Sequence, residues 1–155
     1  MLLSETQKEL IRTTWKVVKD RMDGSNAEIG RAIFLRLFEV APATQELFPF
    51  RGETREELQT SKKLGRHGAN FVRNVERTIE GMDHLFGDVG PKLVSLGARH
   101  YGFGAEEAHY AVVGDVLIYV LDDILKTEFT AEVKEAWIAL YSIISEAMTE
   151  GGRDH

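Results

Sequence analysis

Two histidines, His67 and His100, are the residues of this sequence best suited to chemistry. Each falls on the apolar side of a segment with helical periodicity, His67 between Leu64 and Phe71, and His100 four residues after Leu96. Burying an imidazole among apolar side chains costs free energy unless its ring nitrogens find partners. For one such histidine, a hydrogen bond to a core carbonyl is the ordinary explanation. Two of them on separate helices favour a shared metal group, because imidazole is the commonest metal ligand.

The kind of metal group is limited by the other ligands that the chain offers. A zinc site needs three or four protein ligands, and no carboxylate or cysteine accompanies these two histidines. Haem brings four nitrogens of its own and needs only one or two axial ligands from the protein. Aromatic residues that can line a flat apolar slot for haem, or equally form an ordinary aromatic core, are Phe34, Phe48, Phe50, Phe71, Phe103 and Tyr110.

The other three histidines are expected outside the core. His84 adjoins an acidic loop, His109 lies one residue off the apolar stripe of its segment, and His155 is the terminal residue. Neither a surface position nor a chain end favours a ligand role. The candidate metal ligands are therefore His67 and His100 alone.

Composition excludes several classes of function. The chain has no cysteine, which rules out disulfides, iron–sulfur clusters, a cysteine nucleophile and covalent haem attachment. A net charge of -6 argues against nucleic acid as a partner. The N-terminus lacks the basic and apolar regions of a signal peptide, and no apolar segment is long enough to span a bilayer. We therefore expect a cytoplasmic protein that is not attached to a membrane.

Helical periodicity runs along the whole sequence and must position the two histidines. Apolar residues recur every three or four positions, and no segment alternates convincingly with a period of two. We expect one all-α domain over residues 1–155, with about seven to eight helices. A capping box of Ser4 and Gln7 is expected to begin the first helix, and a short helix is expected from Pro42. A long helix is expected over about 56–79, and a further helix from Pro91 that is closed by Gly102 and Gly104. The last helix is expected to be capped by Thr130 and to stop at Gly151-Gly152.

An ordered set of residues resembles the signature of the globin family over nearly the whole chain. The set comprises Trp15, Pro42 six residues before Phe48, His67, and the stretch Leu96-Gly97-Ala98-Arg99-His100. The resemblance implies a globin fold, with three helices packed on three around haem b, iron protoporphyrin IX.

Within that family the sequence is most similar to the neuroglobin and globin X branches. The likeness to neuroglobins is carried by residues 10–12, 36–38, 93–97 and 135–137, and the likeness to globin X by residues 60–68. Globin X chains usually carry an N-terminal acylation signal, whereas this chain has no glycine at position 2. Membrane attachment is therefore not expected to carry over.

By this resemblance His100 is the proximal iron ligand and His67 is the distal histidine. His67 can either donate a hydrogen bond to bound dioxygen or ligate the iron itself, and the neuroglobin and globin X likeness favours a six-coordinate resting state. Phe48 is expected flat against the haem, with Phe34 and Phe71 on the distal side. The other expected contacts are Leu96, Phe103, Tyr110, Val113 and Tyr141 around the proximal side and rear, and Arg66, Asn70 and Arg99 near the haem propionates.

The resemblance leaves more than one function open. The first is reversible binding of dioxygen, with carbon monoxide, nitric oxide or nitrite as other small ligands. The second is redox chemistry, such as nitrite reduction, nitric oxide dioxygenation or electron transfer, for which an external electron donor is needed. A third is a helical bundle without haem that acts as a binding or sensor module. We expect a monomer or a weak homodimer.

Overall fold

The computed structural model describes residues 2–153, and within that range it contains helices and turns but no strands. The α-helices are α1 (Glu5–Arg21), α2 (Asn26–Val40), α3 (Arg55–Leu58), α4 (Lys62–Glu80), α5 (Gly90–Gly102), α6 (Glu107–Leu125) and α7 (Ala131–Arg153). Between them lie the 3-10 helices Pro42–Leu47, Met82–His84 and Lys126–Glu128 and a π-helical turn, Leu85–Val89. Of the helices described, none is both long and apolar enough to cross a membrane.

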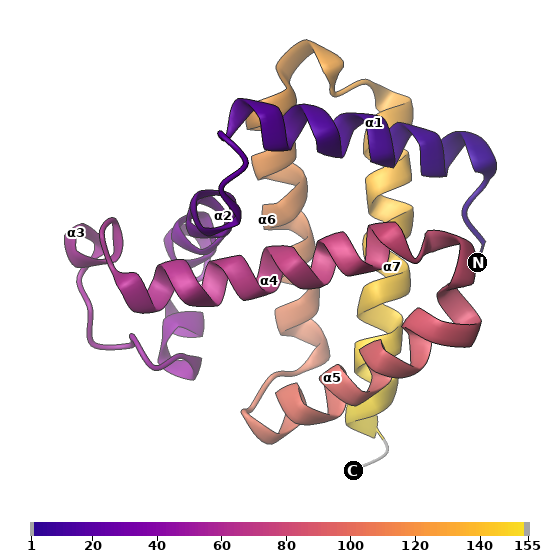
Figure 1. Ribbon diagram of the computed structural model, residues 1–155. Coiled ribbons are helices and arrows are strands. Elements are labelled where there is room, and N and C mark those ends of the chain that lie inside the picture. Colours follow the sequence, from indigo (N-terminus) through magenta and orange to yellow (C-terminus); the bar gives the residue numbers. More distant parts are fainter. Residues whose placement is uncertain (1, 154–155) are drawn as a thin grey trace.

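The helices form two crossing layers. Figure 1 shows α1, α4 and α5 running across α6 and α7, with α2 seen nearly end-on. The buried apolar residues of both layers form one continuous core. The all-α fold class expected from the hydrophobic periodicity is therefore confirmed.

The long helix expected over residues 56–79 is divided in the structure. A capping box between Thr54 and Glu57 begins the short helix α3. The Ser61 hydroxyl then accepts a hydrogen bond from the backbone N–H of Leu64 and begins α4. Each cap pairs an N–H group that a helix start leaves unsatisfied. These two polar caps, rather than the apolar stripe, determine where the helix that carries His67 begins.

Two pairs of helices cross so closely that only glycine fits between them. Where α2 meets α4, a Cβ atom on Gly30 would lie 2.3 Å from the backbone of Gly68. Where α5 meets α7, a Cβ atom on Gly97 would lie 2.1 Å from the carbonyl oxygen of Met148. Both distances are far inside van der Waals contact, so the absence of a side chain sets the separation of the helices.

The α5–α7 crossing also explains why the last helix is longer than expected. A Cβ atom on Gly151 would lie 2.0 Å from the carbonyl oxygen of Val94. Gly151 is therefore a packing residue within α7, which continues to Arg153. The expectation that Gly151-Gly152 stops the helix was wrong, because a glycine can serve close approach as well as termination.

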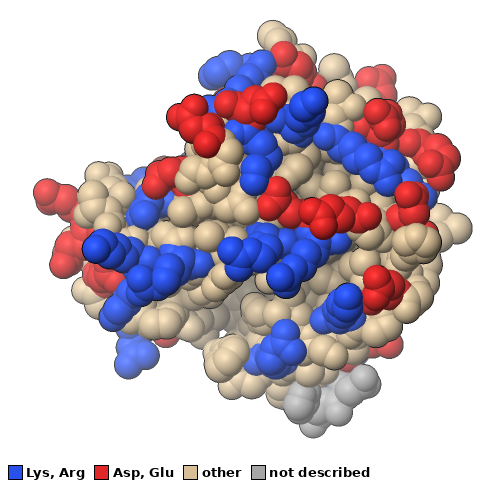
Figure 2. Space-filling model, in the orientation of Figure 1, with Lys and Arg blue, Asp and Glu red and all other residues tan. Residues whose placement is uncertain are grey.

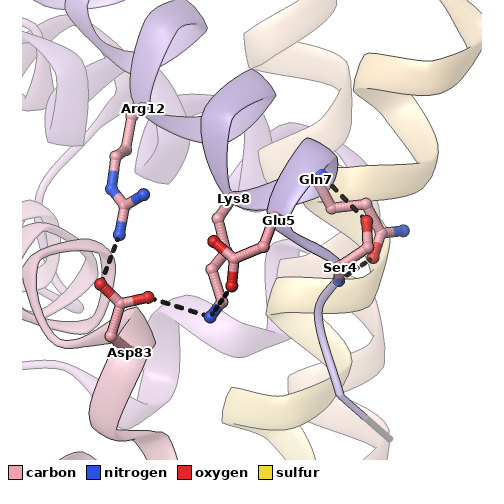
Figure 3. Close-up of polar contacts among 6 residues, drawn as sticks. All are labelled: Ser4, Glu5, Gln7, Lys8, Arg12 and Asp83. Atoms are coloured by element: carbon pink, nitrogen blue, oxygen red, sulfur yellow. Dashed lines mark hydrogen bonds and ion pairs between the residues drawn. The ribbon is translucent and has the colours of Figure 1, made fainter.

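The N-terminal end of α1 is fixed to the corner that follows α4 (Figure 3). The capping box is confirmed, with reciprocal hydrogen bonds of 3.0 Å between Ser4 and Gln7. Two cations of α1, Lys8 and Arg12, pair with Asp83 at 2.9 and 3.2 Å. The ammonium group of Lys8 holds the pKa of the exposed Asp83 carboxyl below its ordinary value.

A carboxylate of α4, Glu76, joins three helices. It accepts hydrogen bonds from the Trp15 indole (3.1 Å) and the Asn26 amide (2.7 Å), and pairs with the Lys19 ammonium (3.0 Å). Burial acts to raise the pKa of Glu76, but the hydrogen bonds from Lys19, Asn26 and Trp15 outweigh burial and lower the pKa. Sequence periodicity gives no sign of this link, because its four members are scattered over α1, α2 and α4.

We expect Glu76→Gln to lower the free energy of unfolding by about 1–2 kcal/mol at neutral pH, because hydrogen bonds to a charged acceptor are lost or weakened. The folded pKa lies below the ordinary value of 4.5, so this contribution is present above that value and is lost as the pH falls through the folded pKa. Urea denaturation at neutral and at acid pH measures the effect. Glu80→Gln, at the exposed end of the same helix, is the control. Equal stability of Glu76→Gln and the unaltered chain at neutral pH would contradict the prediction.

Candidate functional site

His100 lies in the last turn of α5 and has one ring nitrogen already satisfied. Its Nδ1 lies 2.9 Å from the backbone carbonyl oxygen of Leu96, one turn earlier in the same helix. Since a carbonyl oxygen can only accept, Nδ1 carries the proton and Nε2 keeps a free lone pair. Histidines that ligate metals usually make this second hydrogen bond, which fixes the tautomer and the orientation of the ring. The core-carbonyl explanation therefore accounts for only one of the two nitrogens.

His67 projects from α4 toward a group of aromatic rings. Its ring centroid lies 5.0 Å from those of Phe34 and Phe48 and 5.8 Å from that of Phe50, in edge-on contacts in each case. Across residues 2–153, no hydrogen bond or ion pair holds the imidazole of His67. Burial lowers the pKa of His67, and the proximity of the titratable His100 imidazole lowers it further. The imidazole therefore stays neutral at neutral pH, with a lone pair available.

The aromatic residues around His67 form a larger cluster than the sequence predicted. Phe48 stacks on Phe50, with the ring planes 9° apart and the centroids 5.3 Å apart. Phe34 makes edge-on or tilted contacts with Phe38 and Phe71. Phe38 was missed, and Phe50 was expected only as one of the aromatic residues that can line a slot. The sequence spacing could have predicted the Phe34–Phe38 contact, because Phe38 follows Phe34 by about one helical turn and so lies on the same face of the helix.

The residues expected on the proximal side and rear are only partly brought together. The Tyr141 hydroxyl donates a hydrogen bond to the carbonyl oxygen of Tyr110 (2.7 Å), and burial raises the pKa of both phenols. Val113 is half-buried against the same core. Phe103 is different: it follows α5 and is 72% exposed, so the structure does not place it on the apolar wall with the others.

Polar residues lie along the outer edges of the two helices that carry the histidines. Arg66 and Asn70 are exposed on α4, and Arg99 is exposed on α5. A groove of about 770 Å³ separates the second half of α4 from α5, and Leu96 and Arg99 belong to its α5 wall. Of the three polar side chains, the structure therefore places only Arg99 at this groove, and Arg66 and Asn70 lie on the exposed surface of the first half of α4.

The remaining histidines have other surroundings. His109 caps α6, because its Nδ1 accepts a hydrogen bond from the backbone N–H of Glu106 (2.8 Å). His84 is exposed, as expected. His155 falls outside the described residues. Among residues 2–153, His67 and His100 are the two histidines that are half-buried without capping a helix.

This donor set fits haem better than a bare metal ion. Within the described part of the chain, no group of three or more histidine, cysteine, aspartate or glutamate side chains could hold a metal ion. Two imidazoles, His67 of α4 beside aromatic rings and His100 of α5 with Nδ1 bonded to a carbonyl, are of the kind that haem would need as axial ligands. The fold and this site together define an all-α haem-binding protein.

Comparison with known proteins gives the family. A family model described as Globin matches residues 31–148, and the chain belongs to the globin family. The chain is 31% identical over 152 residues to Neuroglobin-1 of Oncorhynchus mykiss and to Neuroglobin of Danio rerio, covering 96% of this chain and 92% of each relative. It is 28% identical over 151 residues to an anaerobic nitrite reductase of Gossypium hirsutum, covering 95% of this chain and 89% of that protein. The neuroglobin-like resemblance and the globin fold are thereby confirmed, and a haem cofactor follows from the family.

We expect Gly97→Ala to destabilise the protein by about 1–3 kcal/mol, because the new methyl group forces α5 away from α7. Gly102→Ala, five residues along the same helix, has open space around its Cβ position and gains helix propensity, so it should be neutral or slightly stabilising. Thermal or urea unfolding of the two variants measures the difference. Equal stability of the two variants would show that the crossing is not close in solution.

Proposed function

We propose that this chain binds haem b with His100 as the proximal ligand and uses it for reversible binding of dioxygen. The hydrogen bond from the His100 Nδ1 to the Leu96 carbonyl is the observation that carries the proposal, because it leaves Nε2 aimed away from its own helix with a free lone pair. Haem, when bound, supplies an iron that binds small ligands reversibly and exchanges single electrons. Carbon monoxide, nitric oxide and nitrite are further ligands of the same site.

His67 would be the second ligand of the haem iron in the resting state. Its imidazole is neutral, lies close enough to His100 for an electrostatic influence, and makes edge-on contacts with aromatic rings. Leaving that position breaks no hydrogen bond to the protein, so external ligands can replace His67. The apparent affinity for an external ligand is then the intrinsic affinity multiplied by the fraction of molecules in which His67 has moved away.

The apolar cluster around His67 controls what reaches this site. Phe34 stands at the distal position from α2 and has no hydroxyl to offer a ligand. His67 is then the one polar side chain that the cluster around Phe34, Phe48 and Phe50 presents. These rings exclude water, which slows the oxidation of ferrous haem. We further propose a single globin domain over residues 1–155, present in the cytoplasm as a monomer or a weak homodimer.

A second candidate function is redox catalysis, in particular the reduction of nitrite. The observation in its favour is the likeness to the anaerobic nitrite reductase, which extends over 95% of this chain. The same two histidines serve either function, because the cofactor carries the chemistry and the protein supplies position and polarity. The two functions differ in their demand for an electron donor, which reversible ligand binding does not need.

Replacing the distal histidine tests the six-coordinate resting state. In His67→Leu we expect the ferrous protein, free of added ligand, to lose the sharp split visible bands of two axial imidazoles. The association rate of carbon monoxide should rise by about tenfold or more, because the fraction of open molecules approaches one. His84→Leu, at an exposed position, is the matched control. Unchanged split bands in His67→Leu would refute ligation by His67.

Replacing the proximal histidine tests the assignment of His100. We expect His100→Ala to lose most of its haem during purification, because α5 contains no second histidine. The ratio of Soret to protein absorbance measures haem retention, and His109→Ala controls for the loss of an imidazole elsewhere. Tight, stoichiometric retention by His100→Ala would show that another residue is the proximal ligand.

A further inference from the structure

A row of cations runs along α4 although the chain as a whole is acidic. Lys62, Arg66, Arg73 and Arg77 are spaced so that they occupy one sector of the helix, roughly 60° wide at about 100° per residue. We call these four residues the basic stripe. Figure 2 shows it as a band of blue side chains across the middle of the molecule, with further blue side chains over α5 below. The net charge of the chain is -6, so charge is unevenly distributed.

The basic stripe is not explained by ion pairing. Among the ion pairs of residues 2–153, each of which lies within 4.0 Å, none involves a member of the stripe. Arg73 makes a hydrogen bond to the neutral amide of Asn70. The carboxylate of Glu76 is engaged with Lys19 and Asn26 instead, and Glu80, one turn after Arg77, makes no ion pair among the described residues. The four positive charges therefore remain available to a partner.

The helix dipole does not explain the stripe as a whole. Arg77 lies in the last turn of α4, where the negative end of the dipole favours a cation. Lys62 lies in the first turn, where the positive end disfavours a cation, and this turn contains no acidic residue. Arg66 and Arg73 lie in the middle of the helix, where the dipole has little effect. Neither ion pairing nor the dipole therefore accounts for the alignment of the four cations.

The basic stripe borders the site where haem is proposed to bind. Around α4, the stripe lies between Glu76 on one side and His67 on the other. Arg66 belongs both to the stripe and to the polar edge expected near the haem propionates. Arg77 and Arg99 face each other across the groove between α4 and α5. A partner that docks on the stripe therefore approaches the exposed edge of the cofactor.

We propose that the basic stripe docks an acidic one-electron donor protein that reduces the haem iron. This inference rests on the proposed function, and in particular on haem bound between His67 and His100. In the step, the donor loses one electron, ferric iron becomes ferrous, and no bond forms or breaks. A compact acidic protein fits this distribution of charge because it can contact the basic stripe alone. An extended polyanion would also contact the acidic surface of the rest of the chain, which repels it. Such electron-transfer contacts are small, weak and strongly steered by charge.

The test compares two variants of equal net charge. Lys62→Gln/Arg73→Gln/Arg77→Gln removes three charges of the stripe and spares Arg66, which is assigned to the haem edge. Lys16→Gln/Lys126→Gln/Lys134→Gln removes three exposed charges from α1, from the turn after α6 and from the start of α7, none of them in an ion pair among the described residues. The probe is reduced flavodoxin, a small acidic flavoprotein. Photochemically generated deazariboflavin radical, which is uncharged, measures reduction without docking.

Binding and reduction are measured with the haem-loaded chain at about 0.01 M and about 1 M salt, between which the screening length falls from about 30 Å to about 3 Å. We expect the stripe variant to lose affinity for flavodoxin in calorimetry, and to be reduced about tenfold more slowly at low salt. High salt should remove the difference, and the control variant should stay within about twofold of the unaltered chain. Deazariboflavin should reduce all three proteins at the same rate.

Three results would overturn the docking proposal. An equal loss of affinity and of reduction rate in both variants would show that net charge, and not the stripe, governs the encounter with flavodoxin. Slower reduction of the stripe variant by deazariboflavin would show damage to the haem site. Binding of the unaltered chain to anionic phospholipid vesicles or to RNA, abolished in the stripe variant, would assign the stripe to a different partner. Failure to take up hemin is a separate result, visible as a missing Soret band, and it overturns the proposed function before any donor is added.

Discussion

The structure of the site depends on two helix crossings at which backbone meets backbone. Gly68 follows His67 directly and lies against Gly30 of α2, while Gly97 lies one turn before His100 and against Met148 of α7. At each crossing the helix separation is set by backbone atoms alone, which leaves little freedom to shift or rotate. Each histidine therefore lies within one helical turn of a backbone-to-backbone contact, which fixes the position of that part of the helix. A side chain at either glycine would move the neighbouring histidine as well as loosen the core.

The two imidazoles are anchored in different ways, and this difference matters for chemistry. His100 is tied to the Leu96 carbonyl, so its orientation is set before any ligand arrives. His67 is held by the edges of Phe34 and Phe48, which restrict its position but offer no directional bond. If both histidines hold haem as proposed, one ligand would be rigid and the other replaceable, which is the asymmetry that reversible binding requires. The difference arises because one half-buried histidine is bonded to its own helix backbone and the other lies among aromatic rings.

Much of this architecture can be predicted from the sequence, because it depends on local patterns of residues. The apolar periodicity, the Ser4 capping box and the inward positions of His67 and His100 depend on residues within a few positions of one another. What was missed depends on contacts between distant segments. The Glu76 link needs partners from α1 and α2, the extension of α7 through Gly151 needs α5, and the full aromatic cluster needs three separate segments. The exposure of Phe103 likewise depends on where the chain goes after α5 ends.

Helix α4 shows how one element can carry several constraints without conflict. Glu76 and its link to α1 and α2 lie on one side of the stripe, Gly68 and the crossing with α2 lie beyond Glu76, and His67 lies on the other side of the stripe. Because packing and the Glu76 link already fix the helix, the charges of Lys62, Lys63 and Glu80 need not stabilise it, and they can run against the dipole at a cost of a few tenths of a kcal/mol each. The stability of α4 thus comes from buried contacts on two sides. That leaves the third side free to be shaped by whatever must approach the edge of the haem.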